Sequence, residues 1–163
     1  MPIDNRDAAR LGKAVEHLVA ATCILTSDLQ LNVSTSFVDD EGVDLVFARR
    51  GQPKTLAVQV KSRRLAGTSM SSGTFRTQVR DATFAAREDL YLLFVAVDPE
   101  EGVFDLAWLV PSVDFAKATS VNSQGRRRFV ASAKEKTQDH WSGDRCSRQD
   151  LASRILNVID NLS

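Results

Sequence analysis

The chain has 163 residues, of which 43% are hydrophobic and 26% are charged, and its 21 basic residues balance its 21 acidic residues. This composition excludes a disordered or collagen-like chain, and the length suits a single globular domain over residues 1–163. No apolar run approaches the ~18 residues of a membrane span, the start is too polar for a secretory signal, and two cysteines make no disulfide framework. We therefore expect a cytoplasmic protein with no membrane partner.

The first third of the chain predicts a helix followed by three strands. Residues 4–26 repeat apolar side chains such as Val15 and Val19 at three- and four-residue steps, and Asp4 suits the helix cap. The predicted strands cover residues 31–38, 43–48 and 55–61, with turn residues at 39–42 and 49–53 between them.

The rest of the chain predicts a helical crossover and further strands. Residues 65–73 have the composition of a flexible loop, and the spacing of Phe75, Val79 and Ala82 predicts a helix over residues 74–87. The remaining predicted elements are strands at 90–97, 103–110 and 128–132, a short helix at 111–115 and an amphipathic helix at 147–162. The main order, α-β-β-β-α-β-β-α, predicts an α/β fold with a central mixed β-sheet flanked by helices.

Polar side chains interrupt the second and third predicted strands. Asp44 begins an otherwise apolar strand, and Gln59 and Lys61 share one face of the next strand. Carboxylate and amide oxygens suit Mg²⁺, and the Val60 carbonyl is a further candidate ligand. A lysine beside the metal can orient a water and help deprotonate it for attack on a phosphodiester.

Glu16 is a candidate second carboxylate. It follows Val15 on the first helix, and Gly12 one turn earlier allows close approach to a strand or ligand. The same polar residues also fit a satisfied cluster on an exposed sheet face, which is the better explanation for each of them taken singly.

Taken together, these residues resemble the PD-(D/E)XK nuclease superfamily, which has the restriction-endonuclease-like fold. They are most similar to its Holliday-junction-resolvase-like branch, in which a helix Glu and a strand Asp precede a Glu-x-Lys or Gln-x-Lys. The matching residues here are Glu16, Asp44, Gln59 and Lys61. The superfamily core matches residues 4–97, and residues 108–112 are similar to a strand followed by Pro-Ser in several members.

The resemblance implies a DNA endonuclease that depends on Mg²⁺ or Mn²⁺, with Glu16, Asp44, Gln59 and the Val60 carbonyl as metal ligands and Lys61 assisting the water. Members that cut duplexes or junctions often dimerise, so a homodimer is expected by resemblance. Gln59 departs from the common acidic residue, which removes one charge and weakens metal binding unless Glu16 compensates. It also fits the alternative of a catalytically inactive nuclease-fold module that binds DNA or a protein partner.

Basic residues are concentrated in two segments. Residues 59–90 and 126–163 each carry a net charge of +3, whereas residues 1–58 and 91–125 carry −2 and −4. On charge alone a mixed solvated surface is the simpler interpretation. With the resemblance, the expected DNA contacts are Arg63, Arg64, Arg76 and Arg80. The run at 126–128 is either another contact or a solvated hairpin, and Gln78 and His17 are expected to support the site from its surroundings.

Overall fold

A mixed six-stranded sheet organises the computed structural model, which describes residues 4–37, 41–66, 70 and 73–163. In spatial order its strands are β1 (Leu31–Thr35), β2 (Leu45–Arg49), β3 (Thr55–Arg64), β5 (Leu90–Asp98), β6 (Val103–Pro111) and β8 (Arg145–Ser147). Strands β3 and β5 run parallel, and the other neighbouring pairs are antiparallel. The predicted α/β class with a central mixed sheet is confirmed.

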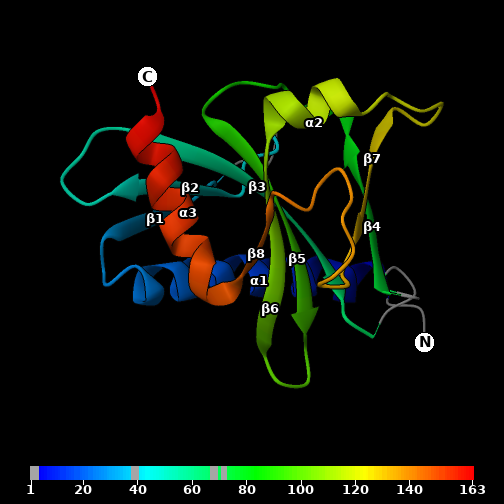
Figure 1. Cartoon of the computed structure of the whole chain (residues 1–163), viewed down its shortest axis with the longest axis horizontal. Helices are drawn as coiled ribbons and strands as arrows, with labels where there is room; N and C mark the ends of the chain where they lie inside the picture. The colour runs from blue at the N-terminus through cyan, green and yellow to red at the C-terminus, as the bar shows by residue number, and fades with distance from the viewer. Residues whose placement is uncertain (1–3, 38–40, 67–69, 71–72) are drawn as a thin grey trace.

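Two helices cover one face of this sheet (Figure 1). Helix α1 (Asn5–Thr26) follows Asp4, whose carboxylate accepts a hydrogen bond from the main chain of the first turn, as predicted for a cap. Helix α3 (Arg148–Asn161) follows Ser147, which caps it in the same way. The helical apolar stripes pack on the sheet, and their fully or nearly fully buried residues are Val15, Val19, Cys23, Leu151, Ile155 and Ile159.

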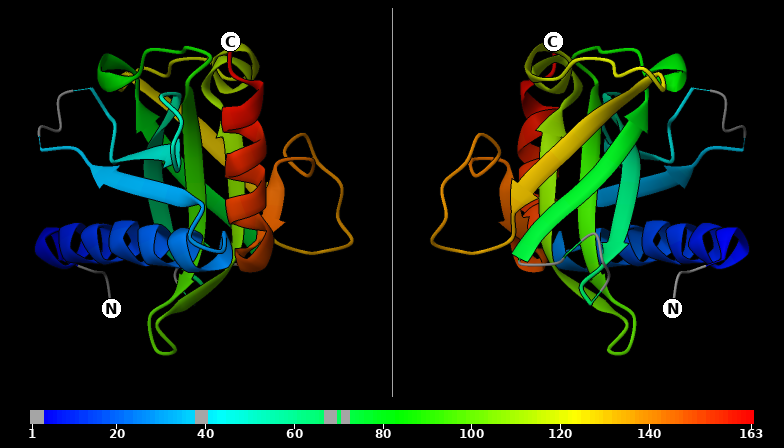
Figure 2. Two further views of the ribbon diagram at one scale, coloured as in Figure 1. Left: turned by 90° about the vertical axis from the view of Figure 1, so that its left-hand side faces the viewer. Right: turned by 90° about the vertical axis from the view of Figure 1, so that its right-hand side faces the viewer.

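A two-stranded ribbon covers the opposite face (Figure 2). Its strands β4 (Thr74–Arg80) and β7 (Arg126–Ser132) pair antiparallel. Between the ribbon and the sheet, Phe129 stacks on Phe94 with ring centroids 3.7 Å apart, and Phe75 meets both rings edge-on. Phe115 of helix α2 (Ser112–Ala118) joins this second core cluster.

The helix predicted over residues 74–87 is wrong. Residues 74–80 form β4, and a single 3-10 turn, η2 (Asp81–Thr83), follows. Phe75 and Val79 are four residues apart, which suits one face of a helix, but Thr77 between them is also buried, as alternation along a strand requires. A parallel pair needs a crossover connection, and here β4 and η2 provide it between β3 and β5.

Smaller differences concern the ends of elements. The strand predicted at 128–132 begins two residues earlier, and β8 was not predicted. Part of the predicted turn at 39–42 and of the predicted loop at 65–73 lies outside the described residues. Among the described residues, no helix is long and apolar enough to cross a membrane.

Candidate active site

The candidate site lies where β2 and β3 separate. The ladder between them ends at Leu45 and Val58, but β3 continues to Arg64. Beyond this point Asp44 occupies the place of a partner strand. Its carboxylate Oδ2 accepts a hydrogen bond from the Val60 N–H at 2.6 Å, and its own N–H donates to the Val58 carbonyl at 2.9 Å. These two bonds hold the carboxylate against the edge of β3.

Gln59 lies beside Asp44 in a tightly packed position. Its side chain is 5% exposed and makes no hydrogen bond to any described residue. Gly42, at φ +67°, packs against it, and a Cβ there would lie 3.0 Å from Gln59 Nε2 and 2.6 Å from the Thr83 carbonyl oxygen. A side chain at position 42 is therefore disfavoured by both space and backbone conformation. A buried amide without a protein partner is costly unless water or a ligand satisfies it.

Lys61 lies two residues after Gln59 and on the same face of β3. This face is shared with Leu92 and Phe94 on β5 and is the one that the ribbon covers. Lys61 is half-buried, and none of the described carboxylates forms an ion pair with it. Its charge is therefore not neutralised by a described partner.

Glu16 approaches the sheet from the other side. Glu16 lies on α1 and is buried, and its carboxylate forms an ion pair with Lys13 at 2.8 Å. Its neighbour Val15 belongs to the core cluster that contains Val60, on the helix-covered face. Within the described part of the chain, no hydrogen bond or ion pair joins Glu16 to Gln59 or Lys61. Among the described residues, Asp44 and the Gln59–Lys61 segment are thus brought together at the open edge of β3, and Glu16 is not joined to Gln59 or Lys61 by any such contact.

The donor set at this edge is oxygen-rich but carries little charge. No group of three His, Cys, Asp or Glu side chains that could hold a metal ion occurs among the described residues. The oxygens of Asp44, Gln59 and the Val60 main chain fit a hard cation such as Mg²⁺, which keeps several waters and needs few protein ligands. With Gln59 in place of a carboxylate, these residues fit a cation that binds weakly.

The four arginines expected to contact DNA have different roles. The Arg63 guanidinium donates to the carbonyls of Ser62 at 2.8 Å and Arg76 at 3.2 Å, and burial lowers its pKa. Arg63 therefore ties β3 to β4. Arg64 is exposed at the end of β3, and Arg76 and Arg80 are exposed on β4, which is a strand where a helix was predicted.

The two predicted supporting residues make no hydrogen bond or ion pair with Gln59 or Lys61 among the described residues. Gln78 is on β4, and its amide oxygen accepts a hydrogen bond from Arg126 at 3.2 Å. The helix predicted to carry Gln78 is absent, and Gln78 lies instead on the outer face of β4. His17 is exposed on α1.

Two structural features were not recognised from the sequence. Gly42 was predicted only as a turn residue, although its missing side chain makes room for Gln59 and Thr83. The arginines at 126–128 belong to a strand, so alternation sends the middle one inward and the outer two to the surface. Predicting a strand rather than a helix for residues 74–80 would have indicated this alternation of the arginines.

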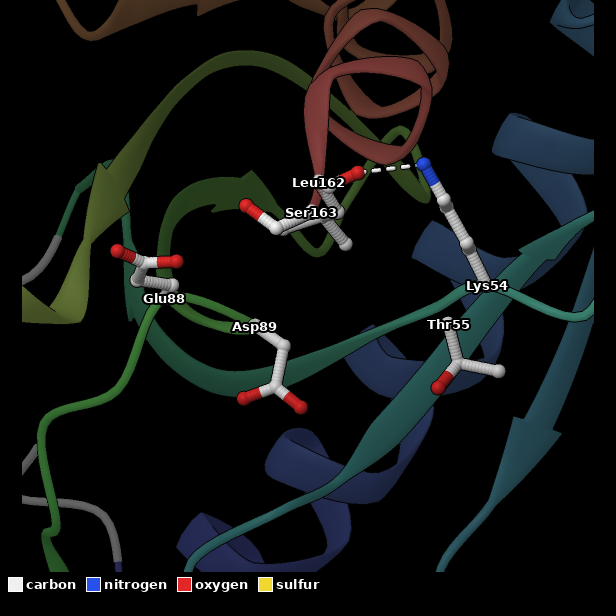
Figure 3. Close-up of a pocket in the computed structure, with 6 residues that line it drawn as sticks. All are labelled: Lys54, Thr55, Glu88, Asp89, Leu162 and Ser163. Carbon is white, nitrogen blue, oxygen red and sulfur yellow. Dashed lines mark hydrogen bonds between the residues drawn. The ribbon is translucent and has the colours of Figure 1, made fainter.

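Other candidate sites in the described residues are weaker. A hollow of about 340 Å³ is lined by Lys54, Thr55, Glu88, Asp89, Leu162 and Ser163 (Figure 3). It lies at the start of β3, about 20 Å along the strand from Lys61. Cys23 and Cys146 are buried and unpaired, and burial raises the pKa of their thiols to about 12 and about 11. Neither cysteine is therefore a thiolate nucleophile near neutral pH.

Comparison with known proteins identifies the fold. No protein-family model matches the chain, and no curated protein sequence matches it. The solved structure of a bacterial homing endonuclease, I-Ssp6803I, matches with a TM-score of 0.58 and 17% identity over 94% of this chain and 93% of that chain. The chain has a restriction-endonuclease-like fold. At this identity the match establishes the fold alone, which is the fold that the sequence resemblance implied.

Proposed function

We propose that the chain is a metal-dependent DNA endonuclease that hydrolyses phosphodiester bonds at the Asp44 edge of β3. The observation that carries the proposal is the Asp44 carboxylate bonded to the Val60 N–H, with Gln59 and Lys61 flanking Val60 on the strand. This arrangement places a carboxylate, an amide and a lysine on two adjacent segments in the order that the superfamily uses. The likeness to I-Ssp6803I, an endonuclease, supports it.

Each residue has a role in the proposed reaction. Asp44, Gln59 and the Val60 carbonyl would hold Mg²⁺ or Mn²⁺, with Glu16 as the second carboxylate. A cation held there supplies Lewis-acid stabilisation of the charge that develops on the phosphate. Lys61 binds the attacking water, orients it toward the phosphorus and assists its deprotonation. In the proposed reaction Glu16 exchanges its ion pair with Lys13 for the metal.

A second candidate function keeps the fold without the chemistry. Gln59 leaves the site with one carboxylate fewer than is common in the superfamily, and such a site suits a module that binds DNA or a protein partner without cutting. The two functions differ in one observable, which is strand cleavage in the presence of Mg²⁺ or Mn²⁺.

The test is a cleavage assay over several DNA forms. Branched, duplex and single-stranded DNA are incubated with the protein and either metal, beside the variants Lys61→Ala and Lys117→Ala. Lys117 is exposed on α2, so its variant is a control for the loss of one positive charge. We expect cleavage by the wild type and by Lys117→Ala, and a loss of about 100-fold or more in Lys61→Ala. Equal cleavage by both variants would exclude the proposed site.

The cleavage assay also reports the substrate form, and sedimentation reports the oligomeric state. Preferential cleavage of branched DNA would place the enzyme with the Holliday-junction-resolvase-like branch, and cleavage of both strands of a duplex would require two sites. Because two sites would be needed to cut both strands of a duplex, we propose a homodimer. Sedimentation of the protein with and without DNA measures its oligomeric state. Retained DNA binding without cleavage by the wild type would favour the inactive module.

A further inference from the structure

The outer face of the β4–β7 ribbon is strongly basic, and the candidate active site does not use it. Alternation along both strands sends Phe75, Thr77, Val79, Phe129 and Ala131 inward, where they are buried. The opposite face carries Arg76, Gln78, Arg80, Arg126, Arg128 and Val130. All of these except Gln78 are exposed, and Gln78 is half-buried.

The charge of this face is one-sided. The two strands hold five arginines and no acidic residue, which leaves 16 of the 21 basic residues against all 21 acidic residues in the rest of the chain. Arg80 lies directly opposite Arg126 in the ladder, and like charges in such cross-strand pairs are destabilising. Among the described residues, no carboxylate forms an ion pair with any of the four outward arginines. An anionic partner would relieve this repulsion.

Arg127 differs from the outward arginines because it binds the ribbon to the segments packed beside it. Its guanidinium points inward, forms an ion pair with Asp81 at 2.8 Å and donates to the Thr119 carbonyl at 2.9 Å. It also lies over the Phe84 ring, 5.6 Å from the centroid. Arg127 thus supplies most of the structural contacts of the run. Arg126 donates one hydrogen bond to Gln78 at 3.2 Å, and both Arg126 and Arg128 contribute charge to the surface.

We propose that the ribbon inserts this outer face into the major groove of duplex DNA. The major groove admits a two-stranded β-ribbon, and arginine and glutamine are side chains that hydrogen-bond base edges and phosphates there. Arg76 and Arg80 are four residues apart, about 14 Å along a strand, which corresponds to roughly four base-pair steps. This spacing of positive charges matches the regular spacing of the phosphates along DNA.

The ribbon lies next to the proposed cleavage site. Arg63 Nε on β3 donates to the Arg76 carbonyl at one end of β4, and the Thr83 carbonyl after β4 approaches Gly42 beside Gln59. Strand β4 therefore passes over the part of β3 that carries Gln59 and Lys61. The right-hand view of Figure 2 shows the ribbon lying over the sheet. The inference rests on the proposed function in its choice of DNA as the polymer, but it does not require cleavage.

The test measures duplex binding in EDTA, where no cleavage takes place. The ribbon variant is Arg80→Gln with Arg128→Gln, and the matched control is Arg50→Gln with Arg148→Gln, which removes two positive charges from the β2 end and the start of α3. Fluorescence anisotropy at several salt concentrations gives the affinity and its salt dependence. We expect the ribbon variant to bind at least about tenfold more weakly, with a salt slope shallower by up to about two, and the control to change little.

Dimethyl sulfate distinguishes the grooves, because it methylates guanine N7 in the major groove and adenine N3 in the minor groove. The wild type should protect guanine N7, and the ribbon variant should lose this protection at protein concentrations that restore binding. Equal weakening by both double variants would overturn the inference, as would protection confined to adenine N3 or tighter binding to RNA than to duplex DNA. A protein that binds through the ribbon but never cuts with Mg²⁺ would sustain this inference and overturn only the proposed nuclease activity.

Discussion

The Asp44 carboxylate accepts a hydrogen bond from the Val60 main-chain N–H at 2.6 Å, at the edge of β3 where β2 has ended. This contact connects the stability of the sheet edge to the proposed chemistry. The carboxylate satisfies a main-chain donor that no neighbouring strand reaches. The same hydrogen bond holds the carboxylate beside Gln59 and Lys61.

Replacement of Asp44 should separate these two roles. Asp44→Ala leaves the Val60 N–H without its acceptor, so the free energy of unfolding should fall by about 1–3 kcal/mol. Asp44→Asn keeps an acceptor oxygen and should retain most of the stability while losing the negative charge. Urea denaturation followed by circular dichroism measures both. Equal stability of Asp44→Ala and the wild type would show that the hydrogen bond contributes little.

Restoring a carboxylate at position 59 should strengthen metal binding. Gln59→Glu adds one negative charge to the proposed ligand set, so the Mg²⁺ concentration for half-maximal cleavage should fall severalfold. The variant should also be destabilised without metal and recover thermal stability when Mn²⁺ is added, because its new carboxylate is buried. Gln30→Glu, at an exposed position, is the control and should show neither effect.

Thr77 offers a test of the ribbon's packing that is independent of function. Its hydroxyl is buried between β4 and the sheet and has no hydrogen-bond partner among the described residues. Thr77→Val keeps the shape and removes the unsatisfied group, so the protein should be stabilised by about 1 kcal/mol. The same change at the exposed Thr55 should be nearly neutral. A loss of stability in Thr77→Val would mean that the hydroxyl has a partner after all.

Asp144 should make stability depend on pH. Burial, with a further contribution from Asp114, raises the pKa of Asp144 to about 6, while Arg154 and His140 act in the opposite direction. The folded state thus holds this proton more tightly than the unfolded state, so its contribution to stability is lost as pH rises from about 4 through 6. Asp144→Asn should have a higher melting temperature than the wild type at pH 7.5 and a smaller advantage at pH 4.5. A difference that does not change with pH would contradict the raised pKa.

The first helix and the three-strand meander could be predicted because local pattern and structure agree there. The roles of Asp44, Gln59 and Lys61 in these segments stay predictions. Residues 31–58 pair with strands that are near neighbours in the sequence, so turn signals and alternation suffice there, whereas the rest of β3 pairs only with β5. Strand β4 could not be predicted in this way because its partner, β7, lies about 50 residues away, and the spacing of Phe75 and Val79 suits both periodicities. The basic face of the ribbon follows from the pairing of β4 with β7, which local sequence patterns do not indicate.

Cleavage by Lys61→Ala, Asp44→Asn and their combination tests the central claim most directly. The measurement is the single-turnover rate of duplex cleavage in Mg²⁺, with binding saturated so that ribbon contacts do not enter. If the two residues act as one site, each single variant should lose about 100-fold or more, and the double variant should lose little beyond that. Cleavage at the wild-type rate by the double variant would contradict the assignment of the nuclease site to Asp44 and Lys61.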